Sequence, residues 1–192
     1  MNFIYGSPPD VALTVANPQP LSKAVGNQLG YYGLAAGLLF AVLLVLATGI
    51  NSELKAMFKN HYNLFFVISG FIGITVAHEI VHFIAYGGLS PGAKVAFGFH
   101  PKAMMAFTFN PAHVSRNRFL FAVAMPLVVL TFVPFVLYWA GVPHANLALP
   151  LAMFNAVGAG GDMVLFFCAI KNVPQACAIQ SSGMGEFWGK PL

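Results

Sequence analysis

The chain has 192 residues, of which 58% are hydrophobic and only 7% are charged, and its formal net charge is +4. A water-soluble domain of this size needs many more charged residues to cover its surface, so the composition excludes an ordinary soluble enzyme and predicts an integral membrane protein. The nine Lys and Arg residues are scattered and form no basic stripe, so the expected surroundings are the lipid bilayer and not nucleic acid.

Four apolar segments predict transmembrane helices. They cover about residues 29–50, 61–88, 119–140 and 147–170. A helix needs roughly 20 apolar residues to cross a bilayer, and each segment is long enough. The fold class that follows is an all-α membrane protein with about four transmembrane helices, forming a single integral membrane domain over residues 1–192.

Residues 90–116, between the second and third segments, have a different pattern. Aromatic residues alternate with small or polar ones at Phe97 and Phe99, and again at Phe107 and Phe109, on either side of a Pro-containing turn. A period of two predicts a small cytoplasmic β-hairpin at the membrane surface. Two roles are open for it: an aromatic face that rests on the membrane, or an edge strand that binds an extended substrate by strand addition.

Basic residues are divided unequally between the two ends of the predicted helices. Cytoplasmic loops of membrane proteins are enriched in Lys and Arg. The hairpin and the tails at residues 1–28 and 171–192 share one side, which carries seven basic residues against two, so we expect both termini in the cytoplasm. The seven are Lys23, Lys94, Lys102, Arg116, Arg118, Lys171 and Lys190, and the two are Lys55 and Lys59.

The second apolar segment contains the motif His78-Glu79-Ile-Val-His82. Residues four apart on a helix lie about 40° apart around its axis, so both imidazoles can face one point and form half of a zinc site. Glu79 could then act as a general base toward a water activated by the metal. Ionisable residues are costly inside an apolar helix, so this cluster favours a functional metal site over a chance match.

Asp162, in the fourth segment, is the candidate for a third zinc ligand, since catalytic zinc usually has three protein ligands. The predicted topology puts it at the same membrane depth as the two histidines. Gly158, Gly160 and Gly161 precede it and are expected to let the second and fourth helices approach each other closely. Asn155 lies seven residues before Asp162, so it is expected on the same face of the helix.

The order of these features resembles a known type of enzyme. An intramembrane HEIVH helix, a hairpin and a later helix with the sequence FNAVGAGGDMV are similar to site-2-protease intramembrane zinc metalloproteases. The similarity is closer still to a family of short bacterial membrane proteins described as putative zincin peptidases. The resemblance implies a bacterial inner-membrane location, with zinc as the cofactor. It assigns zinc binding to His78, His82 and Asp162, water activation to Glu79, and substrate positioning to Asn155.

The function expected from the residues and the resemblance is that of an intramembrane zinc-dependent endopeptidase. Its partner would be a membrane-spanning or membrane-adjacent protein or peptide, hydrolysed by a metal-activated water. The alternative is a non-catalytic membrane protein with a structural metal site, acting in immunity, transport or regulation. Glu79 favours the protease, because a structural site has no use for a base. A di-iron desaturase would need more histidines near the membrane surface than this chain has.

Overall fold

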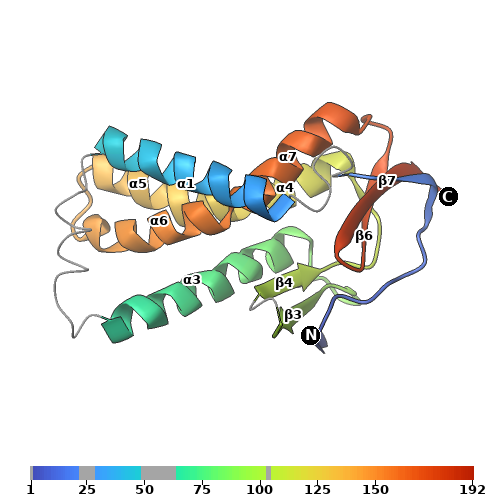
Figure 1. Cartoon of the computed structure of the whole chain (residues 1–192), viewed down its shortest axis with the longest axis horizontal. Helices are drawn as coiled ribbons and strands as arrows, with labels where there is room; N and C mark the ends of the chain where they lie inside the picture. Colours follow the sequence, from blue (N-terminus) through green and yellow to red (C-terminus); the bar gives the residue numbers. More distant parts are fainter. Residues whose placement is uncertain (1, 22–28, 49–63, 103–104) are drawn as a thin grey trace.

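The computed structural model describes residues 2–21, 29–48, 64–102 and 105–192. It joins apolar helices to two small β-sheets, and the strands gather at one end of the molecule (Figure 1). The predicted all-α class is therefore wrong, and the fold is mixed α/β. In the described part of the chain, the sheets have the strand orders β1-β3-β4 and β2-β7-β6-β5.

The first two helices of the described residues are α1 (Leu29–Thr48) and α3 (Leu64–Ala85). Large apolar side chains on both point outward: Leu39 is 62% exposed, Leu46 74% and Phe65 73%. An apolar surface of this extent is unfavourable in water, whereas lipid tails contact it without penalty. These faces therefore suit a membrane environment.

The third apolar segment forms one long helix with a distorted centre. It begins as α4 (Arg116–Leu127), continues through a π-helical turn at Val128–Phe132 (η3), and ends as α5 (Val133–Trp139). The turn begins two residues after Pro126, which has no N–H to donate to the helix. A π turn widens the helix locally, and such turns often occur at functional sites.

The last apolar segment is a pair of helices instead of the one helix expected over residues 147–170. A short 3-10 turn precedes α6 (Leu149–Gly158), and α7 (Gly160–Asn172) follows at an angle of 51°. Three glycines near the junction make a continuous helix unfavourable, because glycine loses more backbone freedom than any other residue. The bend places the first turn of α7, which contains Asp162, beside α3.

Fewer helices could cross a membrane than the four expected. By length and apolar composition, two in the described residues qualify, Ile68–Ala85 and Arg116–Trp139, and a third does if α6 and α7 form one broken span. The apolar stretch Tyr31–Leu46 of α1 is too short to qualify by the same criteria. The structure thus supports two or three membrane-spanning helices.

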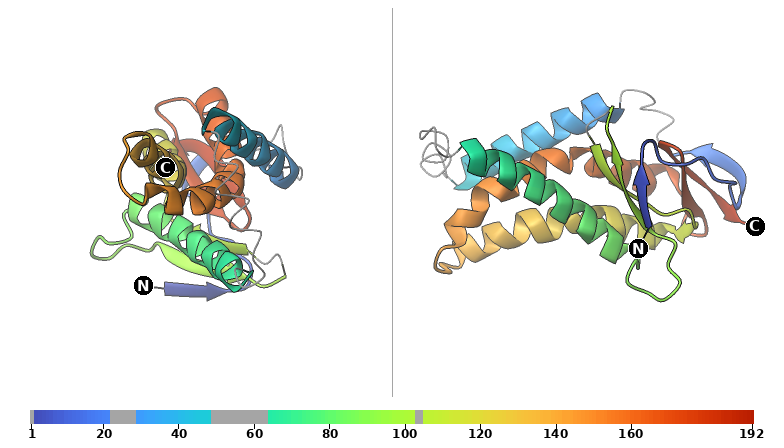
Figure 2. Two further views of the ribbon diagram at one scale, coloured as in Figure 1. Left: turned by 90° about the vertical axis from the view of Figure 1, so that its left-hand side faces the viewer. Right: turned by 90° about the horizontal axis from the view of Figure 1, so that it is seen from below.

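The first sheet contains the predicted hairpin. Strands β3 (Ala96–His100) and β4 (Met105–Phe109) pair in antiparallel fashion, which confirms the hairpin over the alternating aromatic residues. A strand that the sequence analysis did not predict, β1 (Asn2–Tyr5), adds to β3 in parallel, and it lies beside the hairpin in both views of Figure 2. β4 is left as an edge strand.

The second sheet joins the two ends of the chain. It contains β2 (Val15–Pro20), β7 (Gly185–Pro191), β6 (Ala178–Ser182) and the short β5 (Val114–Ser115). Both of the predicted tails thus contain strands. A buried cluster that includes Phe119 of α4, Ala169 of α7 and Ile179 of β6 fixes this sheet to the helices.

The tightest packing near the bend is that of Gly160 against α1, so the expectation that these glycines bring the second and fourth helices together is wrong for that contact. A Cβ atom on Gly160 would overlap the carbonyl oxygen of Gly33, and one on Gly37 would overlap that of Val157. A Cβ atom on Gly158 or Gly161 would meet nothing within 4 Å. Gly160 is therefore the glycine of this group that the α1–α7 crossing requires.

We predict that Gly160→Ala destabilises the fold and that its neighbour Gly161→Ala does not. The added methyl at Gly160 meets backbone that cannot rotate away, so the free energy of unfolding should fall by about 1–3 kcal/mol. At Gly161 the methyl has open space and alanine favours the helix. Thermal unfolding of both variants in detergent, followed by circular dichroism, measures the difference. Equal melting temperatures would contradict the close crossing.

Candidate metal centre

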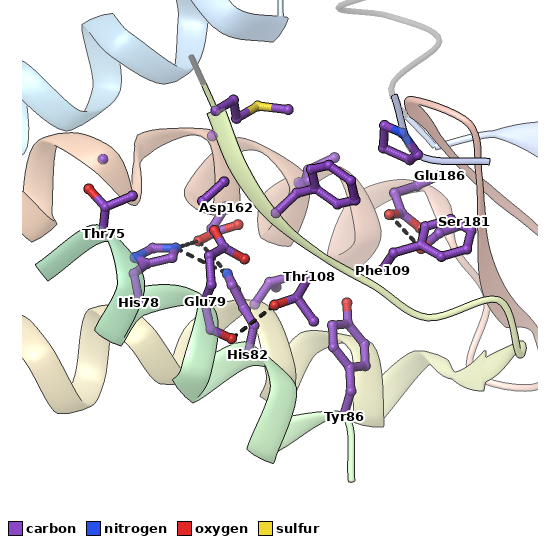
Figure 3. A pocket seen from close by; sticks show the side chains of 18 of the residues that line it. Thr75, His78, Glu79, His82, Tyr86, Thr108, Phe109, Asp162, Ser181 and Glu186 are labelled. Carbon is purple, nitrogen blue, oxygen red and sulfur yellow. Dashed lines mark hydrogen bonds and ion pairs between the residues drawn. The ribbon is translucent and has the colours of Figure 1, made fainter. Parts of the chain in front are cut away.

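Three side chains from two helices converge at one point. His78 and His82 lie near the end of α3, and Asp162 lies in the first turn of α7 (Figure 3). Oδ2 of Asp162 is 3.0 Å from Nε2 of His78 and 3.1 Å from Nε2 of His82, and the two Nε2 atoms are 3.1 Å apart. Ligand atoms bound to one tetrahedral zinc ion at ~2.1 Å lie about 3.4 Å from one another. The structure thus brings the three predicted ligands together at nearly this spacing.

The other nitrogen of each imidazole is held by an acceptor. Nδ1 of His82 lies 3.0 Å from the carbonyl oxygen of Ala122 on α4. A carbonyl can only accept, so this Nδ1 carries the proton and donates it. Nδ1 of His78 lies 2.9 Å from Oδ1 of Asn155 on α6. This oxygen accepts the Nδ1 proton when the amide of Asn155 is oriented with Oδ1 toward His78.

The contacts of Asn155 fix the orientation of its amide. Thr131, fully buried in the π turn, donates its hydroxyl proton to the carbonyl of Ala152 at 3.1 Å. The same hydroxyl accepts a hydrogen bond from Nδ2 of Asn155 at 2.9 Å, and the carbonyl of Pro126 accepts a second from Nδ2 at 3.0 Å. Both amide protons are therefore used, and Oδ1 is the atom that faces His78.

These hydrogen bonds determine which atoms face the centre. Because both Nδ1 atoms donate outward, each neutral imidazole presents the lone pair of its Nε2 toward the carboxylate of Asp162. Three such lone pairs about 3 Å apart need a cation among them, either a proton on an imidazole, which gives an ion pair with Asp162, or a metal ion in its place. Two imidazole nitrogens and one carboxylate oxygen, with outer hydrogen bonds that set the tautomers, are a donor set that suits zinc. His78, His82 and Asp162 therefore fit a zinc ion.

Glu79 lies between the histidines and lines the same cavity, so its carboxylate is available next to the centre. Its backbone carbonyl accepts a hydrogen bond from the hydroxyl of Thr108 at 2.9 Å. This contact joins β4 to α3 beside the candidate base. The sheet is thereby fixed next to the three candidate ligands.

The cavity has a volume of about 490 Å³, and the centre lies in its wall. All five residues of β4, Met105–Phe109, line it, and so does the turn between β6 and β7. No Lys or Arg side chain is among the described residues that line it. An edge strand along a cavity of this size favours the strand-addition role over a face that only rests on the membrane, and that role stays a prediction.

Sequence reasoning missed the groups that orient the histidines. The carbonyl of Ala122 has no side-chain signal, and no pattern could have identified it. Thr131 did have a signal in the sequence, because it is a hydroxyl residue in the otherwise apolar stretch of residues 127–137. Asn155 was selected, but its contact with His78 was not foreseen, since it required α6 and α7 to bend apart.

Comparisons with known proteins agree with this geometry. No curated protein and no solved structure was found to match the chain. The model of one family, described as "Putative zincin peptidase", matches residues 71–178. This stretch is more than half of the chain, and it contains the His78–His82 motif, the hairpin, the third long helix and Asp162. The chain therefore belongs to the putative zincin peptidase family.

Proposed function

We propose that this protein is an intramembrane zinc-dependent endopeptidase that acts in the manner of the site-2 proteases. The observation that carries the proposal is the convergence of two histidine nitrogens and one carboxylate oxygen on one point, beside the glutamate of a His-Glu-x-x-His motif. The open cavity next to it has room for a short stretch of extended peptide. Its substrates would be membrane-spanning or membrane-adjacent polypeptides.

Each residue of the centre has a separate task in this proposal. Zinc, when bound, would polarise the scissile carbonyl and make a nearby water more acidic. His78, His82 and Asp162 hold the ion. Glu79 accepts the proton of the attacking water and returns it to the leaving amine nitrogen. Asn155 orients His78, a task that its contacts support better than the substrate positioning implied by the resemblance, since both amide protons are already engaged.

A structural metal site remains the alternative, and the cavity disfavours it. Structural zinc sites are closed, with four protein ligands, whereas catalytic sites keep an open position. The described residues supply three ligands of this kind, and the cavity reaches each of them. Glu79 lines that cavity without belonging to the three, which is the arrangement that a hydrolytic site needs.

We propose an inner-membrane location with both termini in the cytoplasm. Both termini, the hairpin and the second sheet lie at the same end of the molecule (Figure 1), which supports placing them on one side. The basic residues of these segments favour the cytoplasmic side. Lys23, Lys55 and Lys59 of the charge count lie outside the described residues.

Glu79→Gln should retain zinc and lose proteolysis. Glutamine has nearly the same shape and leaves both histidines in place, but it cannot take a proton from water, so the cleavage rate should fall by at least about 100-fold. Zinc content is measured by atomic emission on the purified protein, and cleavage by mass spectrometry of a peptide mixture. A variant with full zinc and undiminished cleavage would rule out Glu79 as the base.

Asp162→Ala should lower zinc affinity more than any change in the surrounding hydrogen bonds. Loss of an outer-shell partner typically weakens metal binding by about 10–100-fold, which is the range expected for Asn155→Ala, and loss of a ligand should exceed it. Asp162→Glu should impair the cleavage rate more than zinc binding. Competition with a zinc chelator gives the affinities. Unchanged affinity in Asp162→Ala would exclude this residue as a ligand.

A reporter that works in the cytoplasm should be active when it is fused after Leu192. An enzyme that folds only in the periplasm, such as alkaline phosphatase, should be inactive at the same fusion point. The reverse pattern would contradict the proposed orientation, and would also remove the charge argument on which it is based.

A further inference from the structure

A second polar group lies in the cavity, apart from the metal centre. Glu186 is near the start of β7, and Ser181 is on β6, and both line the cavity that contains the centre. Figure 3 shows this pair away from His78, next to Phe109 of the edge strand. Nothing in the proposed hydrolysis uses Glu186.

The carboxylate of Glu186 has little to balance its charge. Oγ of Ser181 lies 2.8 Å from one carboxylate oxygen and 3.0 Å from the other, but it has one proton and can satisfy only one of them at a time. Among the described residues, no Lys, Arg or His forms an ion pair with Glu186. Burial raises the pKa of Glu186 to about 7, although the hydrogen bond from Ser181 acts in the opposite direction.

We propose that Glu186 and Ser181 form a subsite that binds a lysine or arginine side chain of the substrate. This proposal rests on the proposed protease function and specifies its substrates. A basic side chain would supply the missing charge and donate to the unsatisfied carboxylate oxygen. No Lys or Arg of the described cavity wall competes for this position.

The position of the subsite at the sheet end of the molecule agrees with this class of substrate. Glu186 belongs to the second sheet, at the end where both termini lie (Figure 1). In membrane proteins, lysine and arginine collect directly beside the apolar span on the cytoplasmic side. When the apolar part of a substrate lies against the metal centre, the basic residue beside that apolar part would therefore lie at the level of the two sheets.

Peptide binding to the zinc-loaded full-length Glu79→Gln protein tests the proposal without cleavage. The probes are two fluorescein-labelled, N-acetylated apolar peptides in detergent that differ at one position, lysine in one and norleucine in the other. Measured at pH 8, above the pKa of Glu186, the lysine peptide should bind at least about tenfold tighter. Adding Glu186→Gln should abolish this preference and leave the affinity for the norleucine peptide unchanged.

Asp10→Asn is the matched control. Asp10 is exposed and close to the β6–β7 turn, where its carboxylate approaches Gly183, but it does not line the cavity. This change removes one negative charge from the same end of the protein and should leave the lysine preference intact. The subsite is wrong if the lysine peptide binds no tighter than the norleucine peptide, or if Glu186→Gln weakens both equally. Failure of the protease function would instead appear as intact peptides with the unsubstituted, zinc-loaded protein.

Discussion

The central constraint of this structure is electrostatic: three atoms that each present a lone pair are held about 3 Å apart. Such an arrangement is stable only with a cation, a proton or a metal ion, among the three atoms. The protein imposes it by fixing the far side of each imidazole. His82 donates to a carbonyl of α4, and His78 donates to Asn155 of α6, whose amide is in turn held by the π turn.

The third long helix thus controls the centre without contributing a ligand. Its α4 part provides the carbonyl acceptor for one histidine, and its π turn provides the hydroxyl of Thr131 that orients the partner of the other. Loss of either contact would free an imidazole to rotate or change tautomer. Outer-shell partners of this kind are known to tune metal affinity strongly. The distortion that follows Pro126 is therefore part of the site.

The sequence alone predicted the local features and missed the long-range ones. The helix with His78 and His82 and the hairpin both depend on short periodic patterns, which are visible in one segment. The addition of β1 to the hairpin and the whole second sheet escaped prediction, because their pairings join distant residues, such as Val15 with Pro191, and because β2 contains two prolines. Asp162 was found because an acid is rare in an apolar run, whereas Glu186 lies in a polar tail where an acid attracts no notice.

The bend between α6 and α7 has a consequence for the charge of Asp162. A continuous helix would carry this carboxylate in its middle, where the peptide dipoles of neighbouring turns cancel. Because α7 starts anew at Gly160, Asp162 lies instead in a first turn, at the positive end of the macrodipole of α7. The backbone dipoles of α7 therefore stabilise negative charge at the position of this carboxylate. The bent pair of helices thus acts as a fixed electrostatic support for the carboxylate, built entirely from backbone.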